Sequence, residues 1–325
     1  MSKPSTGPAP QRGAALLTAM IIVTLIATLA SAMVWQQWRA VQIESAERAR
    51  VESGWVLLGA LDWARLILAE DARGGNANTD NLTEPWAKPL EEARLSTFLA
   101  ADKQNPSDDD GPEAFLSGSI SDAQATYDLL NLVNNNPAKP EDEGTRKRDQ
   151  FAILLGLCER LGLSNSVAEQ IDDGIRAAGA AQPAADAPLM PARPEQLTWF
   201  GVDPASVAVL APYVNLISPA VPVNVNTAPR EVLAALSGKD LATAERLAQQ
   251  RLSVPFATLD DFAKAAGYTL VADTIGVKTQ YFIVRGRLRL ADHVLEQRSL
   301  VMRSNNGKVT MVSTERVAST DAAVR

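Results

Sequence analysis

The chain has one cysteine and one histidine among its 325 residues. The single cysteine, Cys158, excludes an intrachain disulfide and the usual cysteine-based zinc sites. The single histidine, His293, excludes a histidine triad and any metal site built from several histidines. Because Cys158 lies in an apolar helical run and His293 in a strand-like segment, we interpret both as structural residues.

The usual catalytic motifs are also missing. The sequence has no Gly-rich phosphate loop and no Gly-x-Ser-x-Gly, and its acidic residues are scattered. We therefore predict that the chain is not an enzyme. The net charge of −7, from 31 Lys and Arg against 38 Asp and Glu, argues against a body built to bind polyphosphate, because nucleic-acid affinity depends largely on cationic side chains.

Charge is absent from residues 13–37. At a helical rise of about 1.5 Å per residue, about 22 residues span the roughly 30 Å hydrocarbon core of a bilayer. The run therefore predicts a transmembrane helix over 14–35, followed by a water-soluble body. A cleaved secretory signal is disfavoured, since its apolar core is about 7–15 residues long and the bulky Trp35-Gln-Gln-Trp38 follows here. A plain uncleaved anchor is an alternative.

Proline is absent from residues 36–71, which continue the helical composition. We predict one helix from Ala14 to about Asp71, whose apolar face is formed by Trp55, Leu58, Leu61 and Leu68. A short helix is predicted over 91–100. Asp203-Pro204 and Thr227 are expected to begin later helices as capping residues.

The C-terminal part has the period-2 alternation of strands. Strands are predicted over 114–120, 281–290, 294–303 and 308–315, with Asn305-Asn-Gly307 as a hairpin turn. The arginines that alternate with apolar residues in one of these strands are interpreted as a solvated face or a subunit contact: Arg285, Arg287 and Arg289.

A polar leader ends in Arg12-Gly13, and the apolar helix begins directly at Ala14. This junction resembles the signal of the type IV pilin and type II secretion pseudopilin superfamily. The resemblance implies that a prepilin peptidase cuts between Gly13 and Ala14 on the cytoplasmic side. The fifth residue from Ala14 is Thr18, where most pilins carry a Glu that pairs with the amine of a neighbouring subunit. Lack of this Glu is typical of the large minor subunit K of type II secretion.

Two internal segments resemble the same subunit K family. The first keeps the outline of a strand that leads into an Asn-Leu segment, at Ile120, Asp122, Gln124, Asn131 and Leu132, while Ala125 and Thr126 replace the usual Gly and Arg. The second is Val223-Asn-Val-Asn-Thr-Ala-Pro-Arg, which resembles the family's second sterile-alpha-motif-like unit.

The second segment also resembles helix-hairpin-helix modules of DNA receptors. Those modules hold phosphate on backbone amides of a Gly-x-Gly turn. The corresponding turn here, residues 236–241, has one glycine and an acid, which favours protein contacts. A membrane-anchored periplasmic DNA-binding protein is the alternative interpretation.

The predicted fold class is α+β: a pilin-like long N-terminal helix packs on an antiparallel sheet that carries an inserted helical domain of two sterile-alpha-motif-like units. The expected divisions are a prepilin leader (1–13), a transmembrane helix (14–35), the periplasmic helix with the first strands (36–133), the insertion (134–278), the C-terminal strands (279–316) and a tail (317–325).

The resemblance implies a minor pseudopilin of the type II secretion system, anchored in the inner membrane with its body in the periplasm. Capping of the pseudopilus tip and support for protein export would follow. The implied partners are minor pseudopilins I and J, with H as a further one, the prepilin peptidase and the inner-membrane secretion platform, and no nucleic acid.

Calcium is possible by the same resemblance. However, the segments that usually accompany calcium in this family are not recognisable: only Gln170-Ile-Asp-Asp-Gly174 and an Ala/Pro-rich stretch stand in that neighbourhood. The adjacent aspartates in residues 105–112 do not have EF-hand spacing, and we interpret them as a solvated acidic loop.

Overall fold

The structure is a computed structural model that describes residues 12–74, 78–95, 114–133, 143–180, 182, 184–267, 274–290 and 293–317. The predicted leader before Arg12, the acidic segment 105–112 and the tail after Val317 lie outside these residues, as does the side chain of His293. The chain divides into two compact units between Val56 and Leu57, and each is described by itself.

The first unit contains the N-terminal part of helix α1 (Arg12–Asp71). Its apolar side chains are exposed along their length, including Leu25 at 67% and Ile26 at 60%. The helix is long and apolar enough to cross a membrane. Such a surface is unfavourable in water but matches the hydrocarbon core of a bilayer, in which a helix satisfies its own backbone hydrogen bonds.

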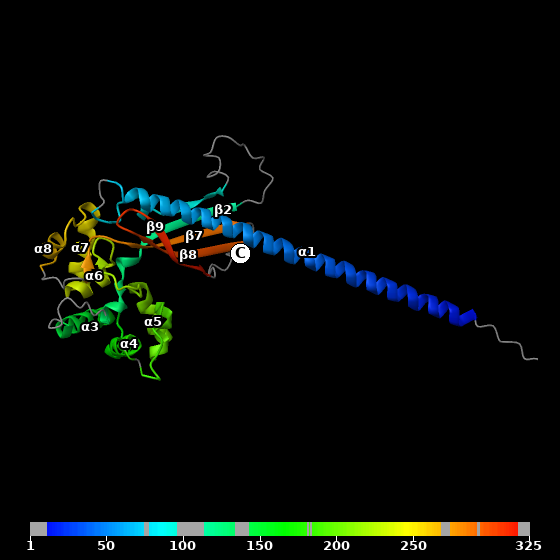
Figure 1. The fold of residues 1–325 in the computed structure, drawn as a ribbon, viewed down its shortest axis with the longest axis horizontal. Coiled ribbons are helices and arrows are strands. Elements are labelled where there is room, and N and C mark those ends of the chain that lie inside the picture. The colour runs from blue at the N-terminus through cyan, green and yellow to red at the C-terminus, as the bar shows by residue number, and fades with distance from the viewer. Residues whose placement is uncertain are drawn as a thin grey trace, which may run out of the picture. The chain divides into compact units, whose positions relative to one another are not determined.

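The second unit is built on a five-stranded antiparallel sheet with the order β1-β2-β7-β8-β9 (Figure 1). Its strands are β1 (Leu90–Arg94), β2 (Ala114–Asp122), β7 (Tyr281–Leu290), β8 (His293–Arg303) and β9 (Val309–Val317). The four strands expected from alternation are therefore confirmed. The hairpin turn between β8 and β9 is confirmed as well, with Gly307 at a φ of 78°.

The helix predicted over 91–100 is wrong for residues 91–94, because residues 90–94 form strand β1. Leu95 is helical, and residues 96–100 lie outside the described residues. Leu90 pairs with Gly118 and Ala93 with Leu116 of β2. The segment Leu-Glu-Glu-Ala-Arg has helical composition but no period-2 signal. Pairing with an existing sheet edge overrides that local preference, since strand formation depends strongly on cross-strand context.

The last turns of α1 pack on one face of the sheet. Their buried side chains are Leu57, Leu61, Ala64 and Leu68, which meet Trp86 of the short 3-10 helix η1 (Pro85–Ala87) and strand residues including Phe282 and Val301. The predicted face was half wrong, because Trp55 is 68% and Leu58 39% exposed. The buried positions 57, 61, 64 and 68 follow the helical spacing of four and three. Positions 55 and 58 are equally apolar, so the sequence alone does not show which of them faces the sheet.

The helical insertion connects β2 to β7 (Figure 1). Its helices are α3 (Glu143–Arg160), α4 (Asn165–Ala178), α5 (Pro204–Leu210), α6 (Arg230–Ser237), α7 (Leu241–Ser253) and α8 (Leu259–Ala266). The 3-10 segments η2 (Ala123–Ala125), η3 (Leu129–Leu132), η5 (Pro194–Phe200) and η6 (Ala211–Tyr213) join them, together with the bridges β3 (Tyr127–Asp128) to β4 (Val214–Asn215) and β5 (Val223–Asn224) to β6 (Ile275–Gly276).

One continuous apolar core holds the insertion together. It includes Leu154 and Cys158 of α3, Ile171 of α4 and Leu233 of α6, so Cys158 is a buried core thiol as expected. Tyr127, Leu129 and Leu132 belong to the same core. The insertion therefore starts just after β2, about ten residues before the expected boundary at 134, because a core includes whatever chain packs in it.

Candidate functional site: a buried polar junction

Asp122 is the last residue of β2, where the sheet gives way to the insertion. Its carboxylate is buried and accepts four hydrogen bonds from three segments. Oδ1 accepts from the Gln124 backbone N–H at 2.6 Å and the Thr279 hydroxyl at 2.5 Å, and Oδ2 from Asn224 Nδ2 at 2.9 Å and the Thr227 hydroxyl at 2.6 Å. Burial raises the pKa of Asp122 to about 6, while these hydrogen bonds oppose the rise.

The hydroxyl of Thr227 therefore bonds to a residue of the sheet, Asp122, and not to the helix that follows it. The expectation that Thr227 caps a helix is wrong: helix α6 begins at Arg230 after Pro229, and no side chain caps it. The Asp203 cap is confirmed, since its carboxylate accepts from the Ala205 and Ser206 amides of α5. Thr227 differs because Pro229 stands before the first residue of the helix and because the Thr227 hydroxyl donates to the buried carboxylate of Asp122.

The two asparagines of the Val-Asn-Val-Asn segment serve the same junction. Asn224 Nδ2 also donates to the Asp80 carbonyl at 2.9 Å, so it joins the loop after α1 to the end of β2. Asn226 makes a paired contact with the backbone of Phe256, donating to its carbonyl at 3.0 Å and accepting from its N–H at 2.9 Å. The alternation of buried valines and asparagines therefore serves packing and cross-linking together.

Gln124 and Asn131 connect distant backbone segments. Gln124 Oε1 accepts from the Gln280 and Tyr281 amides, and its Nε2 donates to the Pro222 carbonyl. Asn131 Nδ2 donates to the Val221 carbonyl at 3.1 Å. These side chains, which belong to the pattern that resembles subunit K, thus bond to backbone groups of distant segments as a neighbouring strand would. They connect the sheet to the insertion in this way.

Asp128 closes the inner side of this network. Its carboxylate accepts from the Leu130 and Val221 amides at 3.0 and 3.1 Å. Burial raises the pKa of Asp128 to about 7. A carboxyl group that is satisfied by neutral donors alone retains most of its desolvation cost.

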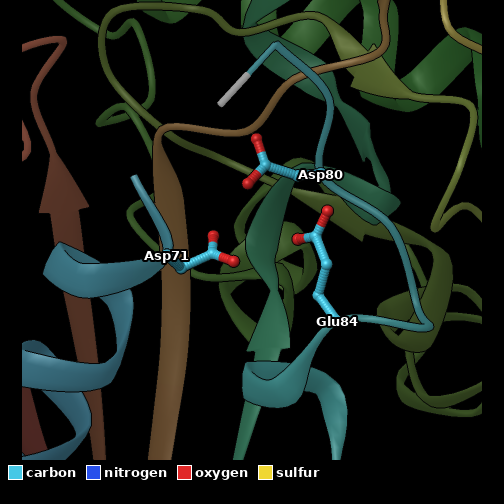
Figure 2. Close-up of side chains that lie close together, drawn as sticks. All are labelled: Asp71, Asp80 and Glu84. Atoms are coloured by element: carbon cyan, nitrogen blue, oxygen red, sulfur yellow. The ribbon is translucent and has the colours of Figure 1, made fainter. Parts of the chain in front are cut away.

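Three further carboxylates, Asp71, Asp80 and Glu84, converge beside the junction (Figure 2). They come from the end of α1, the following loop and the residue before η1, and one oxygen of each lies within 4.8 Å of the others. Hard cations such as calcium bind carboxylate oxygens of this kind but need six to eight oxygen ligands.

Protein groups already satisfy these carboxylates. Arg303 donates from Nη1 to Asp71 at 2.7 Å and from Nη2 to Asp80 and the Thr279 carbonyl. Glu84 accepts from Asn81 Nδ2 at 2.7 Å and Trp86 Nε1 at 2.5 Å. Burial raises the pKa of Glu84 to about 7, and the charges of Asp71 and Asp80 add to the rise. The guanidinium supplies the cation, so the cluster does not fit a calcium site.

Arg303, Asp80 and Thr279 were not foreseen as site residues. They lie far apart in the sequence and meet because α1 ends, β7 begins and β8 ends at the same end of the sheet. No local motif marks them. Asp122, Gln124 and Asn131 were marked by family resemblance alone, without a role.

The predicted processing residues stand at the start of α1. Gly13 and Ala14 lie in its first turn, and Thr18 lies one turn later with an exposed side chain. Among the described residues, none of the other residues singled out from the sequence contacts these three. Cleavage after Gly13 stays a prediction.

In the turn between α6 and α7, which corresponds to the phosphate-binding turn of helix-hairpin-helix modules, the side chain of Asp240 bonds to the start of α7. Gly238 ends α6 in the left-handed conformation, and Asp240 caps α7, accepting from the Thr243 amide at 2.8 Å and its hydroxyl at 3.1 Å. A carboxylate therefore lies where a helix-hairpin-helix module would bring a phosphate group.

The architecture defines a class of protein. A helix able to cross a membrane continues into a segment packed on an antiparallel sheet, and a polar junction joins that sheet to a helical insertion. This is a pilin-like subunit with a membrane anchor and an added helical domain.

Comparisons with known proteins show which family the chain resembles. Residues 223–281 match the family described as type II secretion system (T2SS), protein K. Protein K of the type II secretion system from Pseudomonas aeruginosa is 28% identical over 324 residues, covering 93% of this chain and 92% of that protein. Protein K from Pectobacterium carotovorum is 26% identical over 323 residues, covering 90% and 92%. Protein K from Klebsiella pneumoniae is 28% identical over 330 residues, covering 90% and 93%.

A solved structure shares the fold. It is a chain in the crystal structure of the GspK–GspI–GspJ complex from the enterotoxigenic Escherichia coli type 2 secretion system, with a TM-score of 0.63 and 19% identity, covering 84% of this chain and 99% of that chain. Similarity to protein K over 90% or more of the chain, with the family match at residues 223–281, supports the role of a minor pseudopilin of the type II secretion system. The resemblance and the fold class inferred from the sequence are thereby confirmed.

Proposed function

We propose that this chain caps the tip of a periplasmic pseudopilus, where it assembles with minor pseudopilins I and J and supports export of folded proteins across the outer membrane. Similarity to protein K over 93% of the chain is the observation that carries the proposal. The GspK–GspI–GspJ complex, whose fold the chain shares, supports I and J as partners. Minor pseudopilin H, the prepilin peptidase and the inner-membrane platform are further partners, and the role involves no catalysis.

Two features support a position at the tip. Thr18 cannot form the ion pair that a Glu at that place makes with the amine of a neighbouring subunit, and it avoids burying a charge in lipid, which costs a few kcal/mol. The helical insertion α3–α8 adds bulk beyond the pilin-like sheet. Both features suit a subunit that receives no further subunit above it.

Complementation tests the proposal. In a strain that lacks its own protein K, the wild-type chain should restore secretion and co-purify with minor pseudopilins I and J. Thr18→Glu should restore secretion nearly as well, because a tip subunit does not need that position for stacking. Gly13→Ala should abolish processing and secretion. A processed wild-type chain that neither restores secretion nor retains I and J would contradict the proposal.

A further inference from the structure

The sheet face that points away from α1 is rich in arginine. Along β7, Phe282 and Val284 pack toward α1, so the intervening residues lie on the opposite face. Arg285 and Arg298 are direct cross-strand partners on β7 and β8. The arginines on this face are Arg94, Arg285, Arg287, Arg289 and Arg298, against Glu92, Glu296 and Glu315. On a chain with a net charge of −7, this is a local excess of positive charge.

Two depressions follow this face and meet at Arg285. One is a cleft of about 380 Å³ between the sheet and the insertion. Its lining includes the apolar Ile283, Leu300 and Ile217, and three arginines against two glutamates: Arg193, Arg285 and Arg298, with Glu195 and Glu315. The other, of about 280 Å³, is lined by Ser117, Ser119, Arg285, Arg287 and Glu296 among others. Together they form a groove with an apolar part and a cationic part, which we name the arginine groove.

Arg285 is the member of the groove whose charge has no partner among the residues that the structure describes. Arg289 pairs with Glu92 at 2.7 Å and stacks on Phe115 at 4.0 Å, and Arg298 pairs with Glu315 at 3.2 Å. Arg285 makes neither kind of contact and is exposed. Arg285 also lies directly opposite Arg298, whose charge Glu315 already compensates, so Arg285 is the guanidinium left to pair with an anion from a partner.

The chemistry of the groove selects an acidic polypeptide. Alternate residues of a strand are about 6.6–6.8 Å apart, which is also the spacing of alternate side chains in an extended peptide. Carboxylates bind guanidinium groups through two parallel hydrogen bonds, and the apolar part can receive an aliphatic side chain. Glu92, Glu296 and Glu315 interrupt the positive charge, which disfavours the continuous phosphate of a nucleic acid or lipid surface.

We propose that the arginine groove binds an extended acidic segment of a partner protein, with an aliphatic side chain in the cleft and a carboxylate on Arg285. This binding site is additional to the tip assembly proposed above and does not depend on it.

Peptide binding to the full chain tests this site. The chain is held in nanodiscs of phosphatidylcholine, which carry no net charge, and binding is followed by fluorescence anisotropy. The probe is a short labelled peptide in which glutamates flank one leucine. Wild type should bind it saturably, and added salt should weaken binding. Arg285→Gln should weaken binding about tenfold or more, because it removes a charge-assisted hydrogen bond.

Matched controls separate the groove from general charge. Arg246 of α7 is exposed and likewise has no described partner, so Arg246→Gln removes an equal charge elsewhere and should leave binding unchanged. A peptide with lysine in place of glutamate should not bind, and serine in place of leucine should weaken binding. Equal affinity of wild type and Arg285→Gln would overturn the proposal. So would Arg285-dependent adsorption to phosphatidylglycerol vesicles, or Arg285-dependent self-association, without peptide binding.

Discussion

At the scale of single residues, Asp122 shows how the sheet and the insertion are connected. Its buried carboxylate has donors from η2, from the segment around β5 and from Thr279, two residues before β7. Each hydrogen bond contributes modestly to the free energy of folding. When one donor is removed, however, the cost of burying the carboxylate is no longer fully offset. Asp122 therefore makes the relative position of these segments depend on a few hydroxyl and amide groups.

Removal of one hydroxyl tests this role without changing shape. Thr227→Val and Thr279→Val should each lower the free energy of unfolding by about 1.5–3 kcal/mol at pH 8, since each removes a hydrogen bond to a charged group. The loss should shrink below pH 6 as Asp122 becomes protonated. Denaturant unfolding of the chain in detergent measures both values. Thr310→Val, whose hydroxyl makes only a 3.4 Å contact to the Met302 carbonyl, is the control, and equal losses in all three variants would contradict the assignment.

The buried carboxyl groups also predict an unusual response to pH. In the folded chain the pKa is about 6 for Asp122 and about 7 for Asp128 and Glu84, above their values of 3.8, 3.8 and 4.5 in an unfolded chain. The folded state therefore binds these protons more tightly, and their stabilising contribution is lost as pH rises through 6–7. We expect the melting temperature in detergent to be higher at pH 5 than at pH 8. A lower melting temperature at pH 5 than at pH 8 would show that burial does not raise the pKa of these carboxyl groups in the folded chain.

At the scale of elements, close packing decides which helices can approach one another. Gly174 of α4 lies against the ring of Phe200 at the end of η5, and a Cβ there would come within 2.3 Å of a ring carbon. Gly59 of α1 has no atom within 4 Å of such a Cβ. Both glycines are inside helices, so alanine removes the same propensity cost of about 1 kcal/mol at each.

The two Gly→Ala variants should therefore have opposite effects. Gly59→Ala should raise the free energy of unfolding by about 0.5–1 kcal/mol, because it gains helix propensity without a clash. Gly174→Ala should lower it by about 1–3 kcal/mol, because Phe200 must leave its place. Chemical denaturation of the two variants beside wild type measures the difference. Stabilisation by both substitutions would show that Phe200 does not depend on Gly174.

Elements with a strong local pattern were predictable, and those set by tertiary contacts were not. The strands over 281–290 and 294–303 were identified from alternation, and α5 from the Asp203-Pro204 start. Strand β1 was missed because its pairing with β2 overrides a helical composition. The buried face of α1 was misplaced since Trp55 and Leu58 are as apolar as Leu57 and Leu61. Only the sheet decides which of them it covers.

The contacts of the polar junction were less predictable from the sequence than the fold was. The sequence marked Asp122, Gln124 and Asn131 through resemblance to subunit K, but their partners are about ninety or more residues away. The carboxylates Asp71, Asp80 and Glu84 gave no local signal, and Arg303 of β8 occupies the space that a cation would need. Long-range polar contacts of this kind carry no periodicity, so spacing rules do not reveal them.

At the scale of the whole molecule, one chain combines a helix long enough to cross a membrane with a body whose sheet and insertion are joined by hydrogen bonds at one junction. The apolar part of α1 provides the anchor, and its last turns become part of the sheet's core. The insertion enlarges that body. A subunit that is held in a membrane and contacts other proteins needs these properties.

The N-terminal residue and the mass of the chain, taken from cells with and without a prepilin peptidase, test the central claim most directly. A minor pseudopilin should lose residues 1–13 only when the peptidase is present, so that Ala14 becomes the first residue. An intact Met1 in both strains, or cleavage near residue 32 that does not need the peptidase, would contradict it.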